Sequence, residues 1–406
     1  MKIAIIGGGA GGLFAGGMLS QAGIDTTIFD GNEKLGKKLY ITGKGRCNVT
    51  NNCSKEEFLS HVVHGEKFMM SAISNFDSQS TMSFFENLGC HLKVERGNRV
   101  FPVSDKSSDI TKALIKNIDD SFCKIKLNEK VLSVSAQQGN FVINTSKSNY
   151  TFDKVIIATG GKSYPSTGSQ GDGYILAKNL GHNIVPPMSA LVPIKLKDSF
   201  CHQLQGLTLK NVKLKTVING KTKEFFGELL FANDAITGPI ALSASSYIGD
   251  LNPNLSLDLK PALDHQTLEK RIMRDFQNNL NREISYIIRG LMPKSLAGVF
   301  LKTCDIDEHK KVNSITTKER NKIIDHLKNF PLHFDSLYPV ETGIVTAGGV
   351  DLKEVNPKTM ESKKVKDLYF IGEVLDIDCL TGGFNLQTAF STAYACAKAI
   401  IESRKN

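Results

Sequence analysis

Three glycines near the start of the chain have the spacing of a turn that binds a dinucleotide. Gly7, Gly9 and Gly12 form G-x-G-x-x-G within the run GGGAGG. The first glycine allows a tight turn, the second lets a pyrophosphate approach the backbone, and the third lets a helix pack closely on a strand. Free N–H groups at the start of that helix would bind the phosphates. Asp30 follows after roughly 20 residues, and its carboxylate suits a ribose hydroxyl, although an Asp in D-G-N is also a common turn residue.

A basic, glycine-rich loop follows Asp30. The segment 36–51, GKKLYITGKGRCNVTN, contains no Asp or Glu. Its basic residues are Lys37, Lys38, Lys44 and Arg46. Lysines, hydroxyls and glycines in this mixture wrap a diphosphate with side-chain and backbone donors, so we predict contact with a cofactor; a solvated basic loop is the alternative. Cys47 is either an acid or redox group beside the cofactor or a small buried residue.

The hydrophobic pattern predicts the elements that would position these residues. Residues 2–6 are typical of a buried strand, and the apolar positions after the glycines are spaced as on one face of a helix. A second apolar run, 26–29, ends at Asp30 and completes a βαβ unit. The chain therefore begins with a Rossmann-type nucleotide-binding unit.

Two later segments extend the same domain. Residues 154–158 and 368–371 are typical of buried strands, and they run into TGG and GEVLD. Residues 386–400 indicate an apolar helix. We predict an α/β domain that is discontinuous in sequence and covers residues 1–190 plus 336–406.

The region between them, residues 191–335, has a different pattern. Alternating segments such as LTLKNVKLKTVI predict a β-rich part over 191–260, and charged segments such as HQTLEKRIMRDFQNNL predict a helical part over 261–335. The region contains 21 Lys and Arg against 16 Asp and Glu. We interpret it as an inserted α+β substrate domain with a net positive charge.

Composition and charge narrow the class of protein. With 406 residues, 41% hydrophobic and 22% charged, the chain is an ordinary globular protein and not a disordered one. Its eight cysteines include no C-x-x-C pair, so we expect neither a disulfide framework nor a zinc site. No apolar run is long enough for a signal peptide or a membrane span, and we expect a soluble, cytoplasmic protein. A net charge of +9 permits a polyanionic partner without requiring one.

Four segments resemble those of one flavoprotein family. They are GKKLYITGKGRCNVTNN, ATGGKSYPSTGSQGDGY, ALVPI and the long segment GGVDLKEVNPKTMESKKVKDLYFIGEVLDIDCLTGGFNLQTAF. On these motifs the chain is identified as a member of the BaiN/RdsA family of FAD-binding flavoproteins. Its members include NAD(P)/FAD-dependent oxidoreductases, aminoacetone oxidase-like enzymes, bile-acid C=C reductases and ribosomal RNA dihydrouridine synthases. The resemblance implies a FAD-binding domain similar to that of glutathione reductase, interrupted by a substrate domain with a β-barrel-like part and a helical part.

The resemblance also implies which residues would hold FAD, without a covalent link. The glycine turn, with Ala10 and Gly11, would hold the pyrophosphate, and Asp30, where many members have Glu, would bind the adenosine ribose. The other positions implied by the family motifs are Lys37, Lys38, Thr42, Arg46, Cys47 and Asn48 beside the diphosphate and flavin, Val131 at the adenine, Ala158, Thr159 and Gly160 over the dinucleotide, Gly372, Glu373 and Asp376 at the ribityl chain, and Gly383, Asn385 and Leu386 at the pyrimidine edge of the flavin.

The chain departs from the family at one position. Many relatives have His in the motif F-T-H-x-G-[IL]-S-G-P, and this chain has Asn233 there, in FANDAITGP. If that His serves catalysis in some relatives, this chain either lacks the activity or protonates its substrate differently. The alternative is a turn set by Gly238 and Pro239.

No second G-x-G-x-x-G follows a strand in this sequence. A separate nicotinamide-binding domain is therefore not expected. Any NAD(P)H would dock transiently, in the same cleft as the substrate.

For the reaction we predict hydride transfer between flavin N5 and an activated C=C bond. The leading candidate substrate is uridine in ribosomal RNA, which would become dihydrouridine. A small-molecule flavoenzyme, either an enone reductase or an amine oxidase, is one alternative, and a non-catalytic flavin- and RNA-binding factor is another. Phe200, Phe225, Phe226 and Phe231 occur among lysines, as in readers of single-stranded RNA, although their spacing also fits a core. The oligomeric state stays open.

Uridine reduction would also need a proton donor. Hydride addition to C6 leaves a carbanion or enolate at C5, which must be protonated by a positioned acid. The candidates in the predicted loops are Cys47 first and Tyr164 second, with the loop of Asn233 nearby. A Cys with a pKa near ~8.5 needs little tuning to donate a proton at neutral pH.

Overall fold

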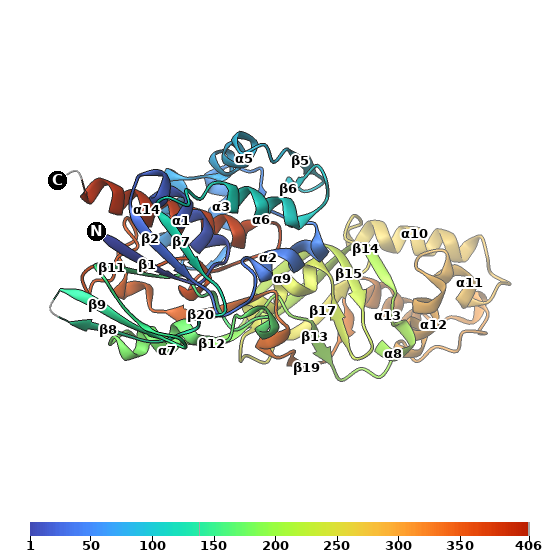
Figure 1. Ribbon diagram of the computed structural model, residues 1–406. Coiled ribbons are helices and arrows are strands. Elements are labelled where there is room, and N and C mark those ends of the chain that lie inside the picture. Colours follow the sequence, from blue (N-terminus) through green and yellow to red (C-terminus); the bar gives the residue numbers. More distant parts are fainter. Residues whose placement is uncertain (138, 405–406) are drawn as a thin grey trace. The chain divides into compact units, whose positions relative to one another are not determined.

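The computed structural model describes residues 1–137 and 139–404 (Figure 1). The chain divides into two compact units. One comprises Met1–Ala190 and Val340–Asn406, and the other comprises Leu191–Pro339. The first unit is thus built from both ends of the chain, and the expected insert, 191–335, lies inside the second.

A five-stranded parallel sheet forms the centre of the first unit. Its strand order is β21-β11-β1-β2-β7. The strands are β1 (Lys2–Ile6), β2 (Asp25–Phe29), β7 (Cys123–Lys126), β11 (Lys154–Ile157) and β21 (Leu368–Phe370). Most residues of β1, β2, β11 and β21 are buried, whereas in β7 only Cys123 is. Because all five strands pair in parallel, they end at the same edge of the sheet.

Helix α1 (Ala10–Gln21) packs directly on this sheet because its glycines leave room for it. A Cβ on Gly12 would lie 1.9 Å from the carbonyl oxygen of Gly7, and one on Gly16 would lie 2.7 Å from a methyl carbon of Ile28. The C-terminal helix α14 (Phe384–Ser403) packs against α1 (Figure 1). This close packing fixes the turn between β1 and α1.

Smaller elements of the first unit surround this centre. The remaining helices are α2 (Lys37–Ile41), α3 (Lys55–Ser60), α4 (Glu66–Asn75), α5 (Ser78–Asn87), α6 (Ser107–Lys116) and α7 (Asp172–Asn179). The remaining strands form a three-stranded sheet of β8 (Val131–Gln137), β9 (Asn140–Thr145) and β10 (Asn149–Phe152), a second one of β3 (Thr50–Asn51), β6 (Arg99–Pro102) and β5 (Leu92–Glu95), and the pairs β12 (Ile184–Ala190) with β20 (Val345–Val350) and β4 (Val62–His64) with β22 (Asp378–Cys379).

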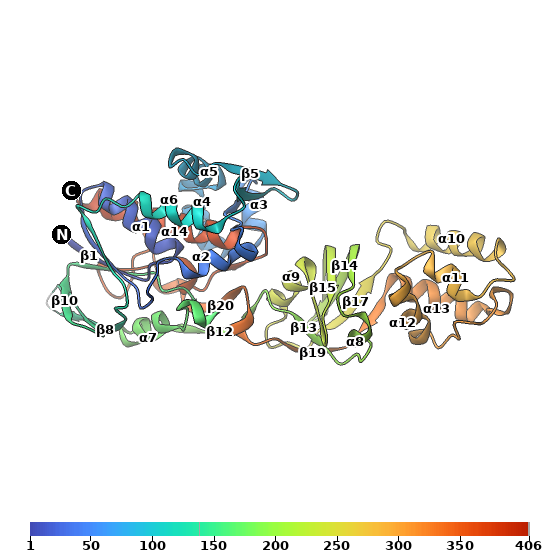
Figure 2. The same cartoon turned by 45° about the vertical axis from the view of Figure 1, so that its right-hand side comes forward.

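The second unit contains a seven-stranded antiparallel sheet and a group of helices (Figure 2). The strands, in spatial order, are β18 (Phe330–Leu332), β17 (Asn254–Asp258), β14 (Thr208–Ile218), β15 (Lys221–Phe231), β16 (Ala235–Thr237), β13 (Ile194–Leu196) and β19 (Phe334–Leu337). The helices are α8 (Cys201–Leu204), α9 (Pro239–Ile248), α10 (His265–Gln277), α11 (Ile284–Arg289), α12 (Lys294–Thr303) and α13 (Thr317–Lys328). Most strands of the sheet precede α10 to α13 along the chain, and β18 and β19 follow them.

The two edges of this sheet are joined by one stretch of chain. Edge strands β18 and β19 are separated only by His333. The first pairs with β17 and the second pairs with β13. This continuous segment makes the sheet barrel-like.

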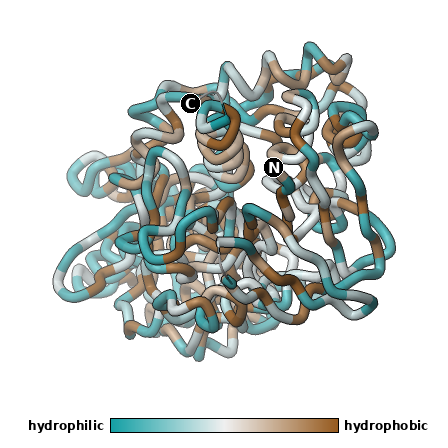
Figure 3. The backbone as a smooth tube through the Cα atoms, turned by 60° about the vertical axis from the view of Figure 1, so that its left-hand side comes forward, coloured by the Kyte–Doolittle hydropathy of each residue, from teal (hydrophilic) through white to brown (hydrophobic). Residues whose placement is uncertain are grey.

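Each unit has its own hydrophobic core. Figure 3 shows hydrophilic segments along the outer loops and hydrophobic stretches along the inner strands and helices. The fully buried aromatic side chains include Phe14 and Phe390 in the first unit and Phe231 and Phe300 in the second. Among the described residues, no helix combines the length and the apolarity needed to cross a membrane.

Candidate functional site

A long pocket lies at the edge where the strands of the parallel sheet end. Its lining begins with the turn after β1, Gly7 to Gly11, and with Asp30, which directly follows β2. Ala158 follows β11, and Gly372 follows β21 by one residue. This is where open α/β sheets bind their ligands, because loops from several parallel strands meet at that edge.

The turn after β1 has the features of a phosphate cradle. Gly7 has a φ of 109°, and a Cβ there would lie 2.5 Å from the carbonyl oxygen of Ala158. Gly9 begins α1 without a side-chain cap, so N–H groups of the first turn stay free for a ligand. A Cβ on Gly9 would meet no protein atom within 4 Å, although this glycine lines the pocket. The open space at Gly9 is what a pyrophosphate requires.

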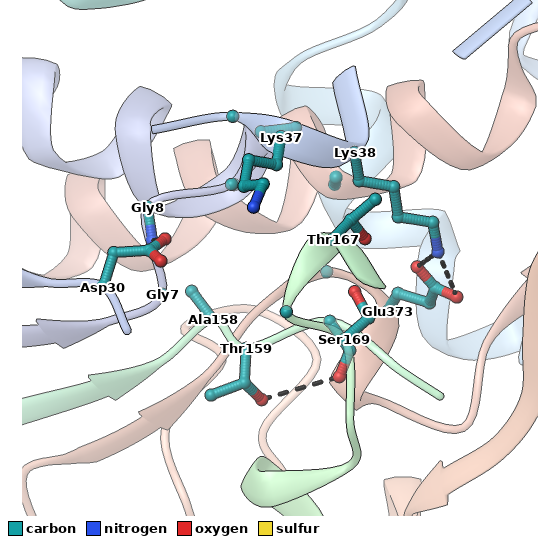
Figure 4. Close-up of a pocket in the computed structure, with 18 of the residues that line it drawn as sticks. Gly7, Gly8, Asp30, Lys37, Lys38, Ala158, Thr159, Thr167, Ser169 and Glu373 are labelled. Atoms are coloured by element: carbon teal, nitrogen blue, oxygen red, sulfur yellow. Dashed lines mark hydrogen bonds and ion pairs between the residues drawn. The ribbon is translucent and has the colours of Figure 1, made fainter. Parts of the chain in front are cut away.

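Asp30 closes a turn and also lines the pocket. Its Oδ1 accepts the backbone N–H of Asn32 at 2.8 Å, which is an Asx turn, and its Oδ2 accepts the N–H of Gly8 at 2.9 Å. The carboxylate therefore fixes the glycine turn and still lines the pocket (Figure 4). A carboxylate held in this way is suited to accept a hydrogen bond from a ribose hydroxyl.

A second polar cluster lies further along the pocket. Lys38 Nζ donates to both oxygens of Glu373, at 3.1 and 2.8 Å (Figure 4). Glu373 Oε1 also accepts the hydroxyl of Ser163 at 3.2 Å and the N–H of Thr346 at 2.9 Å. Four segments that are distant in sequence thus meet at one carboxylate.

The structure brings most of the expected cofactor residues to this one pocket. Those that line it are Gly7, Gly9, Ala10, Gly11, Asp30, Lys37, Lys38, Thr42, Val131, Ala158, Thr159, Gly160, Gly372, Glu373, Asn385 and Leu386. Those that do not line it are Gly12, Arg46, Cys47, Asn48, Asp376 and Gly383. Gly12 instead supports the turn from behind, through its contact with Gly7.

Arg46 lies outside the pocket lining because two carboxylates hold its side chain. Its guanidinium donates to Glu95 and to Asp105, each at 2.5 Å, and it lies over the ring of Phe101. These hydrogen bonds raise the pKa of Arg46 above its ordinary value, with Glu95 as the main cause. Contact of Arg46 with the diphosphate or flavin stays a prediction.

Cys47 and Tyr164 also lie outside the pocket lining. Cys47 is fully buried, and burial raises the pKa of its thiol to about 12. Tyr164 is 36% exposed and has a φ of 53° at the start of a 3₁₀ turn. The alternative for Cys47, a small buried residue, describes its environment better than the proposed acid does. In the other unit, the side-chain oxygen of Asn233 lies 2.7 Å from Nδ1 of His202.

Sequence reasoning missed several lining residues. They include Glu129, Lys130, Thr167, Ser169, Gln170, Ile344, Val345 and Ile377. The motif ATGGKSYPSTGSQGDGY contains Thr167, Ser169 and Gln170 and offered a signal for them. Ile344, Val345 and Ile377 are apolar residues in ordinary contexts, and only the fold shows that they face the pocket.

The free groups around the pocket fit FAD. Gly9 leaves the space of a pyrophosphate. Gly383, the N-cap residue of α14, provides no side-chain cap, so the first N–H groups of this helix are free for acceptors. Within the basic loop, the side-chain oxygen of Asn48, which does not itself line the pocket, is buried and has no hydrogen-bond partner among the described residues. Such an orphaned acceptor is costly unless a bound donor satisfies it.

Comparisons with known proteins agree with this site. The model of the HI0933-like protein Rossmann domain matches residues 1–399. The ribosomal RNA dihydrouridine synthase of Haemophilus influenzae is 32% identical over 98% of this chain and 97% of its own. The 3-dehydro-bile acid delta(4,6)-reductase of Clostridium scindens is 29% identical over 99% of each chain. The solved 3-ketosteroid delta1-dehydrogenase of Sterolibacterium denitrificans has a TM-score of 0.52 at 11% identity, with 99% of both chains covered, which shows a shared fold. The expected family and fold class are confirmed.

Proposed function

The chain belongs to the HI0933-like Rossmann-domain family of FAD-dependent oxidoreductases, and we propose that it reduces a uridine in ribosomal RNA to dihydrouridine. The observation that carries this proposal is the end-to-end match to a ribosomal RNA dihydrouridine synthase, which includes the inserted unit as well as the nucleotide-binding one. The excess of basic residues in the inserted region supports a polyanionic substrate. With ribosomal RNA as the substrate, the enzyme would act in the cytoplasm.

FAD would be held without a covalent bond by the pocket residues. The turn at Gly9 and the start of α1 would bind its pyrophosphate, Asp30 its adenosine ribose, and the residues around Glu373 its ribityl chain. When bound and reduced, FAD supplies a hydride for the double bond. NAD(P)H is the proposed source of that hydride, docking transiently because no second nucleotide-binding motif occurs in the sequence.

A small-molecule enone is the second candidate substrate. It is favoured by the relative named as a bile acid reductase, which matches the chain over the same length. Both relatives' names describe the reduction of a carbon–carbon double bond, so the two candidates share their chemistry and differ in the molecule that carries the bond. An amine oxidase would instead take hydride from its substrate and pass electrons to oxygen.

Gene deletion tests the substrate directly. We expect the deletion strain to lose dihydrouridine at one position of ribosomal RNA, and the wild-type gene to restore it. Complementation with Gly9→Val is the matched control, because this variant should fold without binding FAD and should not restore the modification. An unchanged dihydrouridine map in the deletion strain would reject the RNA proposal.

Stopped-flow kinetics of the purified holoenzyme test the reaction class. We expect rapid flavin reduction by NADPH or NADH and slow reoxidation by oxygen. Rapid reduction by a small amine with prompt formation of hydrogen peroxide would identify an oxidase and contradict the proposal. Denatured holoenzyme should release FAD, and recovery of FMN would contradict the cofactor assignment.

A further inference from the structure

A histidine–carboxylate pair lies beside the pocket in the nucleotide-binding unit. His64 is the last residue of β4 and Asp378 is the first residue of β22, and these strands pair antiparallel with the two residues opposite each other. Nδ1 of His64 lies 2.5 Å from Oδ1 of Asp378. The Asp378 side chain is fully buried, whereas that of His64 is 46% exposed. The pair therefore joins a buried carboxylate to a ring that reaches solvent.

The pair is attached to residues that line the pocket. Ile377, which precedes Asp378, is itself a lining residue. The side chain of Asn385, another lining residue, accepts the N–H of Cys379 at 3.0 Å and donates to its carbonyl oxygen at 2.8 Å. Gly65, which follows β4, approaches the same residue: a Cβ on Gly65 would lie 2.9 Å from a side-chain carbon of Ile377. Asp378 thus lies between Ile377, which lines the pocket, and Cys379, which Asn385 binds, and His64 contacts Asp378.

This part of the pocket is where the flavin ring would lie. The glycine turn and Asp30 mark the pyrophosphate and the ribose of the adenosine half, so the opposite half of FAD would extend toward Glu373 and the start of α14. Asn385 and Ile377 belong to that end of the lining. A group beside Ile377 is consequently near the region where a substrate would meet the flavin.

The charges around His64 favour its protonated form. The hydrogen bond to Asp378 raises the pKa of His64 above its ordinary value, burial opposes this, and Asp376 adds to the rise. The pKa of Asp376 is itself raised, mainly by burial, with smaller contributions from Asp378 and Asp351. Oδ2 of Asp378 has no hydrogen-bond partner among the described residues, so this buried carboxylate depends on His64 for compensation. Because Asp378 occupies Nδ1, the proton available for transfer is the one on Nε2.

We propose that His64 is the proton donor for the reduction and that Asp378 positions the imidazole and stabilises its protonated form. This inference rests on the proposed function. As hydride from reduced FAD forms a C–H bond at one carbon, the π electrons of the double bond move to the other carbon and its conjugated carbonyl. Nε2–H of His64 then gives its proton to that carbon, and the neutral imidazole regains a proton from water. Each turnover thus consumes one hydride, supplied by a nicotinamide donor, and one proton.

Cys47 is less suitable for this role. It is fully buried, whereas the ring of His64 reaches solvent; neither Tyr164 nor His64 itself lines the pocket. A protonated histidine held by a carboxylate is a better acid at neutral pH than a thiol with a pKa of about 12. Many relatives have a histidine where this chain has Asn233. With His64 in this role, the chain has a proton donor without that histidine.

The test uses His64→Gln and Asp378→Asn, with His61→Gln as the matched control. His61 lies on the same segment, where Nδ1 is 2.7 Å from the carbonyl oxygen of Glu57 and the ring stacks on Phe384. Three quantities are measured on the holoenzymes: flavin content, the rate of flavin reduction by NADPH, and the single-turnover oxidation of the reduced enzyme by an unmodified ribosomal RNA transcript between pH 5.5 and 9. The imidazole signals of His64 are titrated by NMR in parallel.

We expect His64→Gln to retain its flavin and its reduction by NADPH within about twofold and to lose roughly 10² or more in the oxidation step, as for loss of a general acid. In the wild-type enzyme the oxidation rate should fall at high pH, where His64 is deprotonated. This fall should be absent from the profile of His64→Gln. Asp378→Asn should lower the pKa of His64 in the NMR titration and move the rate profile to lower pH by the same amount. His61→Gln should behave as wild type.

Three outcomes would overturn the inference. Oxidation of reduced His64→Gln at the wild-type rate and with the wild-type pH profile would show that the proton comes from elsewhere, while leaving the proposed function standing. Loss of FAD from His64→Gln would assign the residue to cofactor binding. A His64 pKa that stays the same in Asp378→Asn would refute the pairing. If RNA fails to oxidise the reduced wild-type enzyme, the substrate proposal fails instead, and the NMR titration still decides the pairing.

Discussion

Lys38 Nζ lies 2.8 Å from a carboxylate oxygen of Glu373, although 335 positions separate the two residues in the chain. The pair connects α2 to the 3₁₀ turn Gly372–Val374 that follows β21, and both residues line the pocket. Its side chains are mostly buried, with 25% and 21% exposed. The pair therefore links the basic loop at one end of the sequence to the turn Gly372–Val374 at the other.

This pairing predicts a measurable coupling between the two residues. We expect Lys38→Met to lower the stability of the apoprotein and its affinity for FAD more than Glu373→Gln does, because it leaves a partly buried carboxylate without its cation. A double-mutant cycle should give a coupling of about 1 kcal/mol or more. Urea denaturation and FAD titration of the two single variants and the double variant measure it. Additive effects would show that the ion pair contributes nothing of its own.

The glycine turn predicts opposite behaviour for two neighbouring glycines. Gly9→Val should leave the stability of the apoprotein nearly unchanged, because no protein atom lies within 4 Å of its Cβ position, but it should abolish FAD binding. Gly12→Val should destabilise the apoprotein by about 3 kcal/mol or more, because its Cβ would lie 1.9 Å from the carbonyl oxygen of Gly7. Thermal unfolding and flavin content distinguish the two. A stable Gly9→Val variant that retains FAD would contradict the phosphate assignment.

In the second unit, two phenylalanines of β15 should differ in how much they contribute to stability. Phe231 is 1% exposed and belongs to the core of that unit, whereas Phe226 is 63% exposed. Phe231→Ala should cost about 3–5 kcal/mol of unfolding free energy, and Phe226→Ala should cost less than about 0.5 kcal/mol. Chemical denaturation followed by circular dichroism measures both. Equal losses would contradict this difference in burial, and a larger loss for Phe226→Ala would show that the two faces of the strand are exchanged.

Helix α13 predicts a pH-dependent contribution to stability. Glu319 closes a capping box with Thr316, and hydrogen bonds from Lys310 first and then from Thr316 lower the pKa of Glu319 from 4.5 to about 2. A carboxylate whose pKa is lower in the folded than in the unfolded state stabilises the protein at pH values above the unfolded-state pKa. This stabilisation is lost as the pH falls through the folded-state pKa. Glu319→Gln should therefore lower the melting temperature at pH 7, and the difference from wild type should disappear between pH 4.5 and 2. A difference that is constant over this range would exclude the ionised carboxylate as its cause.

The sequence alone determined those parts of the site that depend on neighbours along the chain. The turn at Gly7, Gly9 and Gly12, the acid at Asp30 and the apolar strands before them are encoded within one βαβ unit, because the turn, the helix start and the strand each need particular residue types at fixed short spacings. The long family motifs extended this prediction to the turn around Glu373 and to the start of α14. Most of these residues line one pocket, as expected.

Only the tertiary structure decided how side chains from distant segments are paired. The sequence placed Arg46 at the cofactor, but the fold brings Glu95 and Asp105 to its guanidinium, and these acids lie 49 and 59 positions away. It likewise buries Cys47 and joins His64 to Asp378 across 314 positions. Such pairings depend on how whole elements dock, and the energy of one contact is small beside the burial of the apolar faces that drives docking. A local pattern therefore specifies which groups a site has, whereas the packing of the core determines which of them meet.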